Sequence, residues 1–252
     1  MSESLLRLTY FARHSVRLFL PLLAAAVLVA EPGGSSTDEV VSKYRQALAA
    51  QQYAQRDIAA DVTFEAHIPK LKKQGRLNAL RQISNVGKVT YKILGFSGDD
   101  TVKKEVIARY MSAEVDSASK RSEEVGITPA NYSFKYKGLN NKDGRQLHVL
   151  ELKPKAKRVG LFKGELWLEA DSYLPVREQG RFVKSPSLFI KKVEFTRDYE
   201  IRDGIAYLVH MQSKTDTRIV GVAELNANYT NYHNLRDSVA ERVEEARREL
   251  ND

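Results

Sequence analysis

The feature that most constrains the fold is a series of short alternating segments that fills the second half of the chain. Apolar and polar residues alternate over Tyr132–Tyr136 and Gly164–Ala170, and a longer strand pattern covers Phe189–Tyr199. A period of two places every second side chain on the same face of a strand. Turn signals separate these segments, at Asn140–Gly144 and at Asp203–Gly204, and Asp-Gly is a strong hairpin signal. The pattern predicts antiparallel strands joined by short turns, with one face covered.

The first half of the chain mixes helical and strand patterns. Ser36–Glu39 has the form of a capping box and predicts a helix that continues to about Gln52. A second helix is predicted from Thr101 to about Ser117, and a loop or lid from Ser117 to Pro129. Strict alternation over Ala60–Ile68 predicts a strand with one face covered. Further strands are expected at Leu77–Ile83, Lys88–Leu94, Gln146–Leu152, Leu174–Val183, Ile205–Met211 and Thr217–Tyr229, and a charged helix at Leu235–Asp252. The fold class is therefore α+β, a strongly curved antiparallel sheet with helices on one side.

The first thirty residues have the pattern of an export signal. Basic residues precede an apolar run from Leu18 to Ala30, which is 13 residues long. A bilayer-spanning helix needs about 20 residues, so this run fits the core of a secretory signal. We expect cleavage after Ala26 or after Ala30, with an uncleaved anchor as the alternative. The predicted organisation is a signal peptide over residues 1–30 and one domain over residues 31–252, in a periplasmic, soluble protein.

Composition narrows the chemistry. The chain of 252 residues has no cysteine, which excludes disulfides, a thiol nucleophile, Cys-ligated metals and a lipidated N-terminal cysteine. Its net charge is +8. Basic residues concentrate at Lys70–Lys73, Lys153–Arg158 and Lys191–Lys192. Such tracts favour an anionic membrane surface or an acidic envelope protein as a partner, or act only as solubilising charge. The export signal and the lack of a recognition motif argue against nucleic acid.

Catalytic motifs are absent from the sequence. His67, His148 and His210 lie on predicted strands, but no two histidines have the spacing of metal ligands, so we expect neither a metal nor a cofactor. Glu165 and Glu169 share one strand face, and two carboxylates within reach could hydrolyse an envelope polymer. Cross-strand pairing with lysines is the simpler interpretation. We therefore expect no enzyme activity, with a hydrolase as the weaker alternative.

Four segments carry a resemblance to a known family. Gly160–Arg177, with its returning Leu-Pro-Val, resembles the outer-membrane lipoprotein-sorting family, which includes LolA-like carriers and RseB-like regulators. Lys184–Phe189, Tyr199–Gly204 and Thr217–Leu225 resemble the strands that follow in those proteins. The resemblance covers roughly residues 38–233. It implies an incomplete β-barrel that covers helices and encloses an apolar cavity for acyl chains.

The resemblance gives two functional hypotheses. The first is a soluble carrier that holds lipid or lipoprotein acyl chains in the cavity. The second is an envelope-stress sensor or protein-docking module of the same fold. Plain core packing is the alternative role for every residue expected to line the cavity. These residues are Phe64, Tyr91, Ile93, Trp167, Phe182, Phe189 and Phe195.

Overall fold

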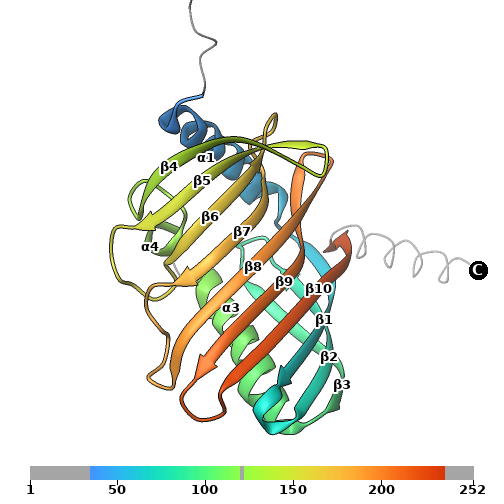
Figure 1. The fold of residues 1–252 in the computed structure, drawn as a ribbon. Helices are drawn as coiled ribbons and strands as arrows, with labels where there is room; N and C mark the ends of the chain where they lie inside the picture. Colours follow the sequence, from blue (N-terminus) through green and yellow to red (C-terminus); the bar gives the residue numbers. More distant parts are fainter. Residues whose placement is uncertain (1–34, 120–121, 236–252) are drawn as a thin grey trace, which may run out of the picture. The chain divides into compact units, whose positions relative to one another are not determined.

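The computed structural model describes residues 35–119 and 122–235. Ten strands form one antiparallel sheet in the order β3-β2-β1-β10-β9-β8-β7-β6-β5-β4 (Figure 1). The sheet is not closed, because β3 and β4 are its two edges. The strands are β1 (Ile58–Ile68), β2 (Lys73–Ile83), β3 (Val89–Gly98), β4 (Tyr132–Lys142), β5 (Arg145–Pro154), β6 (Phe162–Glu169), β7 (Pro175–Phe182), β8 (Ile190–Arg202), β9 (Ile205–Thr217) and β10 (Val222–Asn234).

Two helical segments pack on this sheet. Helix α1 (Thr37–Ala54) contacts β4 and β9. The second segment comprises α2 (Asp100–Val102), the π-helical turn η2 (Lys103–Ala108) and α3 (Arg109–Ser119), and it packs on the part of the sheet formed by β1, β2, β3 and β10. A 3-10 turn, η1 (Pro69–Leu71), joins β1 to β2, and a short helix α4 (Ser122–Val125) precedes β4. Among the described helices, none is long and apolar enough to span a bilayer.

The covered face of the sheet holds two separate hydrophobic clusters. The first contains Phe64 and Leu77 beneath the second helical segment. The second contains Tyr44 of α1 with Leu150 and Phe195 of the sheet. Paired residues on neighbouring antiparallel strands lie on the same face. Met211 of the first cluster lies two residues from Ser213, the partner of Phe195, so both clusters lie on the same face and meet between β8 and β9.

The structure confirms the predicted fold class of an antiparallel sheet with helices on one face. Ser36 is the N-cap of α1, and its hydroxyl accepts a hydrogen bond from the Glu39 amide at 3.2 Å. The Glu39 carboxylate binds Lys43 at 2.8 Å, and its pKa is lowered first by Lys43 and also by a hydrogen bond with the Ser36 backbone, as in a capping box. The expected loop after Ser117 is partly helical, since α3 continues to Ser119 and α4 follows.

The last two strands differ from the prediction, because β9 is longer and β10 lies later in the chain. Strand β9 continues to Thr217, and the turn to β10 occupies residues 218–221. The prediction that a strand begins at Thr217 is therefore wrong, and β10 instead begins at Val222. The predicted export signal and nearly all of the predicted helix Leu235–Asp252 lie outside the described residues. The cavity that the resemblance implies stays a prediction.

Candidate functional site

The candidate site is the seam where the two hydrophobic clusters meet on the covered face. An ion pair lies on this seam, between Glu178 of β7 and Arg197 of β8, with Nη1 3.0 Å from Oε2. The two residues are register partners across β7 and β8, and Arg197 is also the partner of Met211 across β8 and β9. Strand register therefore places a charged pair beside an apolar cluster.

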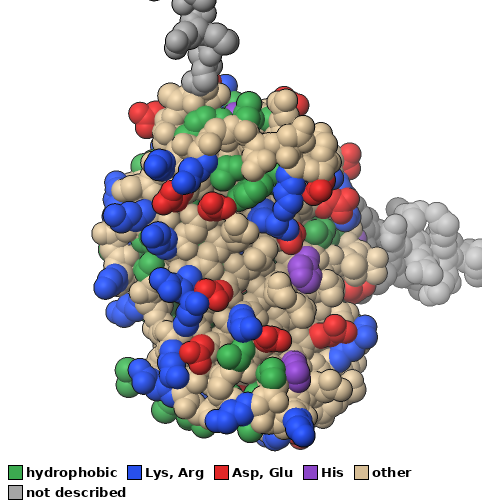
Figure 2. Space-filling model, viewed as in Figure 1, with side chains coloured by type: hydrophobic (Ala, Val, Ile, Leu, Met, Phe, Trp, Pro, Cys, Tyr) green, Lys and Arg blue, Asp and Glu red, His purple; other side chains and the backbone are tan. Residues whose placement is uncertain are grey.

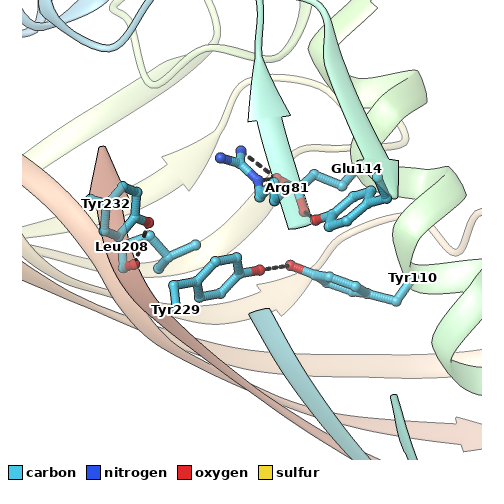
Figure 3. Close-up of polar contacts among 7 residues, drawn as sticks. Arg81, Tyr110, Glu114, Leu208, Tyr229 and Tyr232 are labelled. Carbon is cyan, nitrogen blue, oxygen red and sulfur yellow. Dashed lines mark hydrogen bonds and ion pairs between the residues drawn. The ribbon is translucent and has the colours of Figure 1, made fainter. Parts of the chain in front are cut away.

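A second polar group lies on the other side of the seam, under α3. Glu114 of α3 accepts two hydrogen bonds from Arg81 of β2, at 2.9 Å from Nε and 2.6 Å from Nη2. Its other oxygen accepts a hydrogen bond from the Tyr91 hydroxyl. The hydroxyls of Tyr110 and Tyr229 lie 3.1 Å apart. Figure 3 shows these side chains converging from α3, β2 and β10.

The two polar groups interact with each other. The positive charge of Arg197 opposes the rise in the pKa of Tyr110 that burial causes, so the two groups are within electrostatic reach of each other. Burial raises the pKa of Tyr44 and of Tyr199, and the negative charge of Glu178 raises both further. We call the combined set the polar belt. It consists of Arg81, Tyr91, Tyr110, Glu114, Glu178, Arg197, Tyr199 and Tyr229.

Most side chains of the belt are largely shielded from water, since those of Arg81, Glu114 and Glu178 keep 13%, 19% and 12% of their surface exposed. Burial raises the pKa of Tyr91 and of Tyr110, and the negative charge of Glu114 raises both further. For Arg197, burial lowers the pKa, but Glu178 and nearby tyrosines outweigh burial and leave the pKa above its ordinary value. All three groups therefore keep their neutral or cationic form at neutral pH.

Depth does not make the belt inaccessible. Burial affects the pKa of Arg197 more than any single neighbour does. The Arg197 side chain nevertheless keeps 33% of its surface exposed. Apolar residues packed against the two clusters are also only half-buried, among them Leu208 on β9, Met111 on α3 and Leu48 on α1. An apolar surface that is open along a polar line suits an amphiphile, whose chain contacts the clusters while its polar group meets the belt.

A separate depression lies on the opposite face of the sheet. Its volume is about 660 Å³ and its lining is mainly polar, at β1, β2, β3 and β10. Glu65 and Glu224 within it pair with Arg76 at 3.4 Å and with Lys214 at 3.2 Å. The lining residues are Glu65, Ala66, His67, Gln74, Gly75, Arg76, Ser97, Gly98, Glu224 and Asn226. This depression is therefore not the predicted apolar cavity.

The residues expected to line the cavity fall into three groups. Phe64 and Phe195 are buried in the two clusters, with Tyr91 and Phe182 packed beside them on the covered face. Ile93 lies on the edge strand β3 and is exposed.

The third group contains Trp167 and Phe189, which are not on the covered face. Trp167 points to the opposite face from its buried neighbours Leu166 and Leu168, and its Nε1 donates to Glu165 at 3.0 Å. Phe189 is exposed in the loop between β7 and β8. The cavity-lining role stays a prediction for all seven residues.

The carboxylates of the hydrolase hypothesis are engaged within their own hairpin. Glu165 accepts hydrogen bonds from Trp167 and from Gln179. Glu169 accepts from the amide and the hydroxyl of Ser172. Burial raises the Glu169 pKa, but these hydrogen bonds outweigh it and lower the pKa overall. A general acid needs a raised pKa, so the lowered pKa does not favour Glu169 as the acid of such a pair.

The three strand histidines do not gather at one place. His67 pairs in register with Glu224 on the polar outer face, and its ring lines the depression there. His210 bonds to Asn228 on the same face. His148 is buried on the covered face, where it bonds to the Tyr136 hydroxyl at 2.8 Å. Within residues 35–119 and 122–235, no group of acidic and histidine side chains has the arrangement of a metal site.

The polar belt was missed by sequence reasoning. Its only sequence signal is the four-residue spacing of Tyr110 and Glu114, which puts both side chains on one face of α3. Glu178 and Arg197 are joined by strand register alone, and no local pattern marks them.

Comparison with known proteins finds similarity at the level of solved structures. No protein-family model and no curated protein matches the chain. Similar structures include a putative outer membrane lipoprotein-sorting protein domain from Vibrio parahaemolyticus, 13% identical with a TM-score of 0.41, which covers 79% of this chain and 93% of that one. The LolA superfamily protein NE2245 from Nitrosomonas europaea is 10% identical with a TM-score of 0.37, and covers 79% and 93%.

A third similar structure is the MucA/MucB complex of Pseudomonas aeruginosa. It is 11% identical with a TM-score of 0.27, and covers 76% of this chain and 99% of that one. The first two structures are of the lipoprotein-sorting and LolA-like kind that the strand patterns of Gly160–Arg177 resemble. The similarity to these solved structures is a likeness to a LolA-like or MucB-like fold.

Proposed function

We propose that this protein is a soluble carrier of the periplasm that holds acyl chains of lipids or lipoproteins on the covered face of its sheet. The observation that carries the proposal is the seam between the two hydrophobic clusters. Helix α1 covers one cluster and α3 the other, and apolar side chains along the seam stay half-buried. An acyl chain that fills the seam would remove this apolar surface from water.

The energetics of this binding need no catalytic group. Each methylene that leaves water contributes about 0.8 kcal/mol, so a long chain gains enough to bind against the loss of its own freedom. The polar belt gives the bound molecule an orientation, because its ester, carboxylate or phosphate group can meet Arg197 while the chain cannot. Exchange of the ligand would require α1 or α3 to move away from the sheet.

Two tryptophan substitutions on one strand test the carrier. Leu208 of β9 packs half-buried against the first cluster, whereas Gln212 of the same strand is exposed on the opposite face. Leu208→Trp fills space on the seam and should reduce uptake of a fluorescent fatty acid by tenfold or more, since about 1.4 kcal/mol is a factor of ten. Gln212→Trp adds the same side chain on the other face and should leave uptake unchanged.

Native mass spectrometry of the wild-type protein provides the second measurement. We expect lipid to co-purify with the exported protein and to be reduced in Leu208→Trp. Circular dichroism and thermal melts verify that both variants fold. A wild-type protein that carries no lipid and takes up no fatty acid would refute the carrier, as would equal effects of the two tryptophans.

A second candidate function is protein docking, which an open edge of the sheet favours. β3 is an edge strand, and Ile93 and Leu94 on it are exposed. An exposed edge strand can pair with an extended segment of another protein. This function predicts a specific partner in a pull-down from envelope extract, and Leu208→Trp should leave that complex intact while Ile93→Lys weakens it.

A further inference from the structure

The four strand-to-strand connections at one end of the sheet differ in chemistry from the four at the other end. The first end holds residues 69–72, 155–161, 183–189 and 218–221, and the second holds 84–88, 143–144, 170–174 and 203–204. The connections at the first end contain seven basic residues and no acidic residue. The basic residues are Lys70, Lys72, Lys155, Lys157, Arg158, Lys184 and Arg218. The connections at the second end contain one basic residue and three acidic ones, Lys88, Asp143, Asp171 and Asp203.

The seven basic side chains are exposed and keep their charge uncompensated. None of them forms an ion pair with a described residue. Three of them, Lys155, Arg158 and Arg218, donate side-chain hydrogen bonds, and each of the acceptors is a neutral oxygen, of Pro129, Asn131 and Leu188 in turn. Topology brings together basic tracts that are far apart in the sequence, and a positive surface results.

Apolar side chains project from the same end. Leu188 is 88% exposed, Ile219 67% and Phe189 58%, and Leu71 is exposed between Lys70 and Lys72. In the four connections at the other end, one large aliphatic side chain is exposed, that of Val86. In Figure 2, basic and apolar side chains lie along the lower end of the sheet, where the turns after β7 and β9 lie in Figure 1.

Backbone contacts join these loops into one surface. The Arg218 amide donates to the Phe189 carbonyl at 2.9 Å, and its Nε donates to the Leu188 carbonyl at 2.9 Å. The Val183 amide donates to the Leu161 carbonyl at 3.0 Å. η1 packs on β10. These contacts hold the loops that carry the apolar side chains next to the loops that carry the basic ones, and we call this surface the basic end.

We propose that the basic end docks on an anionic lipid bilayer, with Leu188, Phe189 and Ile219 entering the headgroup region and the lysines and arginines contacting the lipid charges. Two properties select a bilayer over a soluble acidic partner. The charge is spread over four loops and not focused on one groove, and the protruding side chains are aliphatic and aromatic. Basic residues beside projecting apolar ones are the features that hold a protein at a membrane interface. This inference does not depend on the carrier hypothesis.

Flotation of the full chain with vesicles tests the proposal. We expect binding to vesicles of phosphatidylcholine and phosphatidylglycerol, weakening at high salt, and little binding to phosphatidylcholine alone. Lys184→Gln should lower partitioning about fivefold, because a basic residue near an anionic surface contributes about 1 kcal/mol. Leu188→Ser should lower partitioning and leave its salt dependence unchanged.

Matched variants at the other end provide the control. Lys88→Gln and Val86→Ser remove the same kinds of side chain from the turn between β2 and β3, and both should bind vesicles as the wild type does. The proposal is overturned if phosphatidylglycerol does not increase binding, or if the control variants lose as much binding as Lys184→Gln and Leu188→Ser. Capture of a soluble polyanionic peptide without vesicle binding would also overturn it. Fatty-acid uptake should be normal in all four variants, so failure of docking is separable from failure of the carrier.

Discussion

Removal of the Glu114 carboxylate should be among the most destabilising changes on the covered face. Glu114 is the acidic partner of Arg81, with two hydrogen bonds at 2.6 and 2.9 Å, and it also accepts from Tyr91. The Arg81 and Glu114 side chains keep only 13% and 19% of their surface exposed. Glu114→Ala therefore leaves a guanidinium and a phenol below the surface without an acceptor.

The magnitude follows from this geometry. Breaking a buried pair by removing one partner costs about 3–5 kcal/mol, because the remaining charge stays desolvated. Water can enter along the seam and solvate Arg81 in part, which favours the lower figure of about 3 kcal/mol. For a domain of this size, 1 kcal/mol corresponds to a shift in melting temperature of about 2–4 °C. We therefore expect a decrease of roughly 6–12 °C.

The assay is urea unfolding followed by circular dichroism, with an exposed ion pair as the control. Glu65 and Arg76 lie 3.4 Å apart on β1 and β2 with side chains more than half exposed, so Glu65→Ala should cost less than about 1 kcal/mol. The double variant Arg81→Met, Glu114→Leu removes both charges and should be more stable than Glu114→Ala. If Glu114→Ala unfolds at the same urea concentration as Glu65→Ala, the reasoning about burial is refuted.

Three further changes test other parts of the structure. Gly164→Ala should cost about 2–4 kcal/mol, because a Cβ there would lie 1.9 Å from the Gln179 carbonyl oxygen, whereas Gly95→Ala, with open space around it, should stay within about 0.5 kcal/mol. Equal urea midpoints for the two would contradict this. Burial raises the pKa of Tyr132 to about 12, so the unfolded chain releases its proton first and stability should fall as the pH rises from about 10 to 12. Tyr132→Phe should flatten that part of the stability curve, and an unchanged slope would count against the shift. Ser36→Ala should cost about 1 kcal/mol through loss of the α1 cap, and a melt identical to that of the wild type would mean that this helix end contributes nothing.

Sequence patterns predicted strands wherever one face of the strand is evenly buried. Val62, Phe64, Ala66 and Ile68 alternate in the sequence and are all buried in β1. The prediction failed where a turn lacks the usual turn residues. Residues 218–221 are Arg-Ile-Val-Gly, of which only Gly221 has positive φ. Two β-branched residues in a turn have the appearance of a strand, so the boundary between β9 and β10 was misplaced.

The candidate site could not be predicted in the same way, because it depends on pairing between distant segments. Arg197 faces Glu178 only because β7 and β8 pair in one register, and a slip of one residue would turn Arg197 to the other face. Tyr110 reaches Tyr229 only because the helical segment that carries Tyr110 packs on β10. Local periodicity does show that Arg81 lies on the same face of β2 as Ala79. It does not show that an acidic residue of α3 will lie above Arg81.

The two proposals address two departures from the rule that apolar residues lie inside and charged residues outside. The polar belt puts Arg81 under Glu114 of α3 and Arg197 beside an apolar cluster, and the basic end exposes Leu188 and Phe189 to water. Buried charge and exposed apolar surface both oppose folding in an isolated domain. A ligand in the seam and a bilayer at the basic end would relieve these two penalties at different sites. Stability of the domain should therefore rise when fatty acid or anionic vesicles are added, and the two increases should be additive, since the sites share no residue.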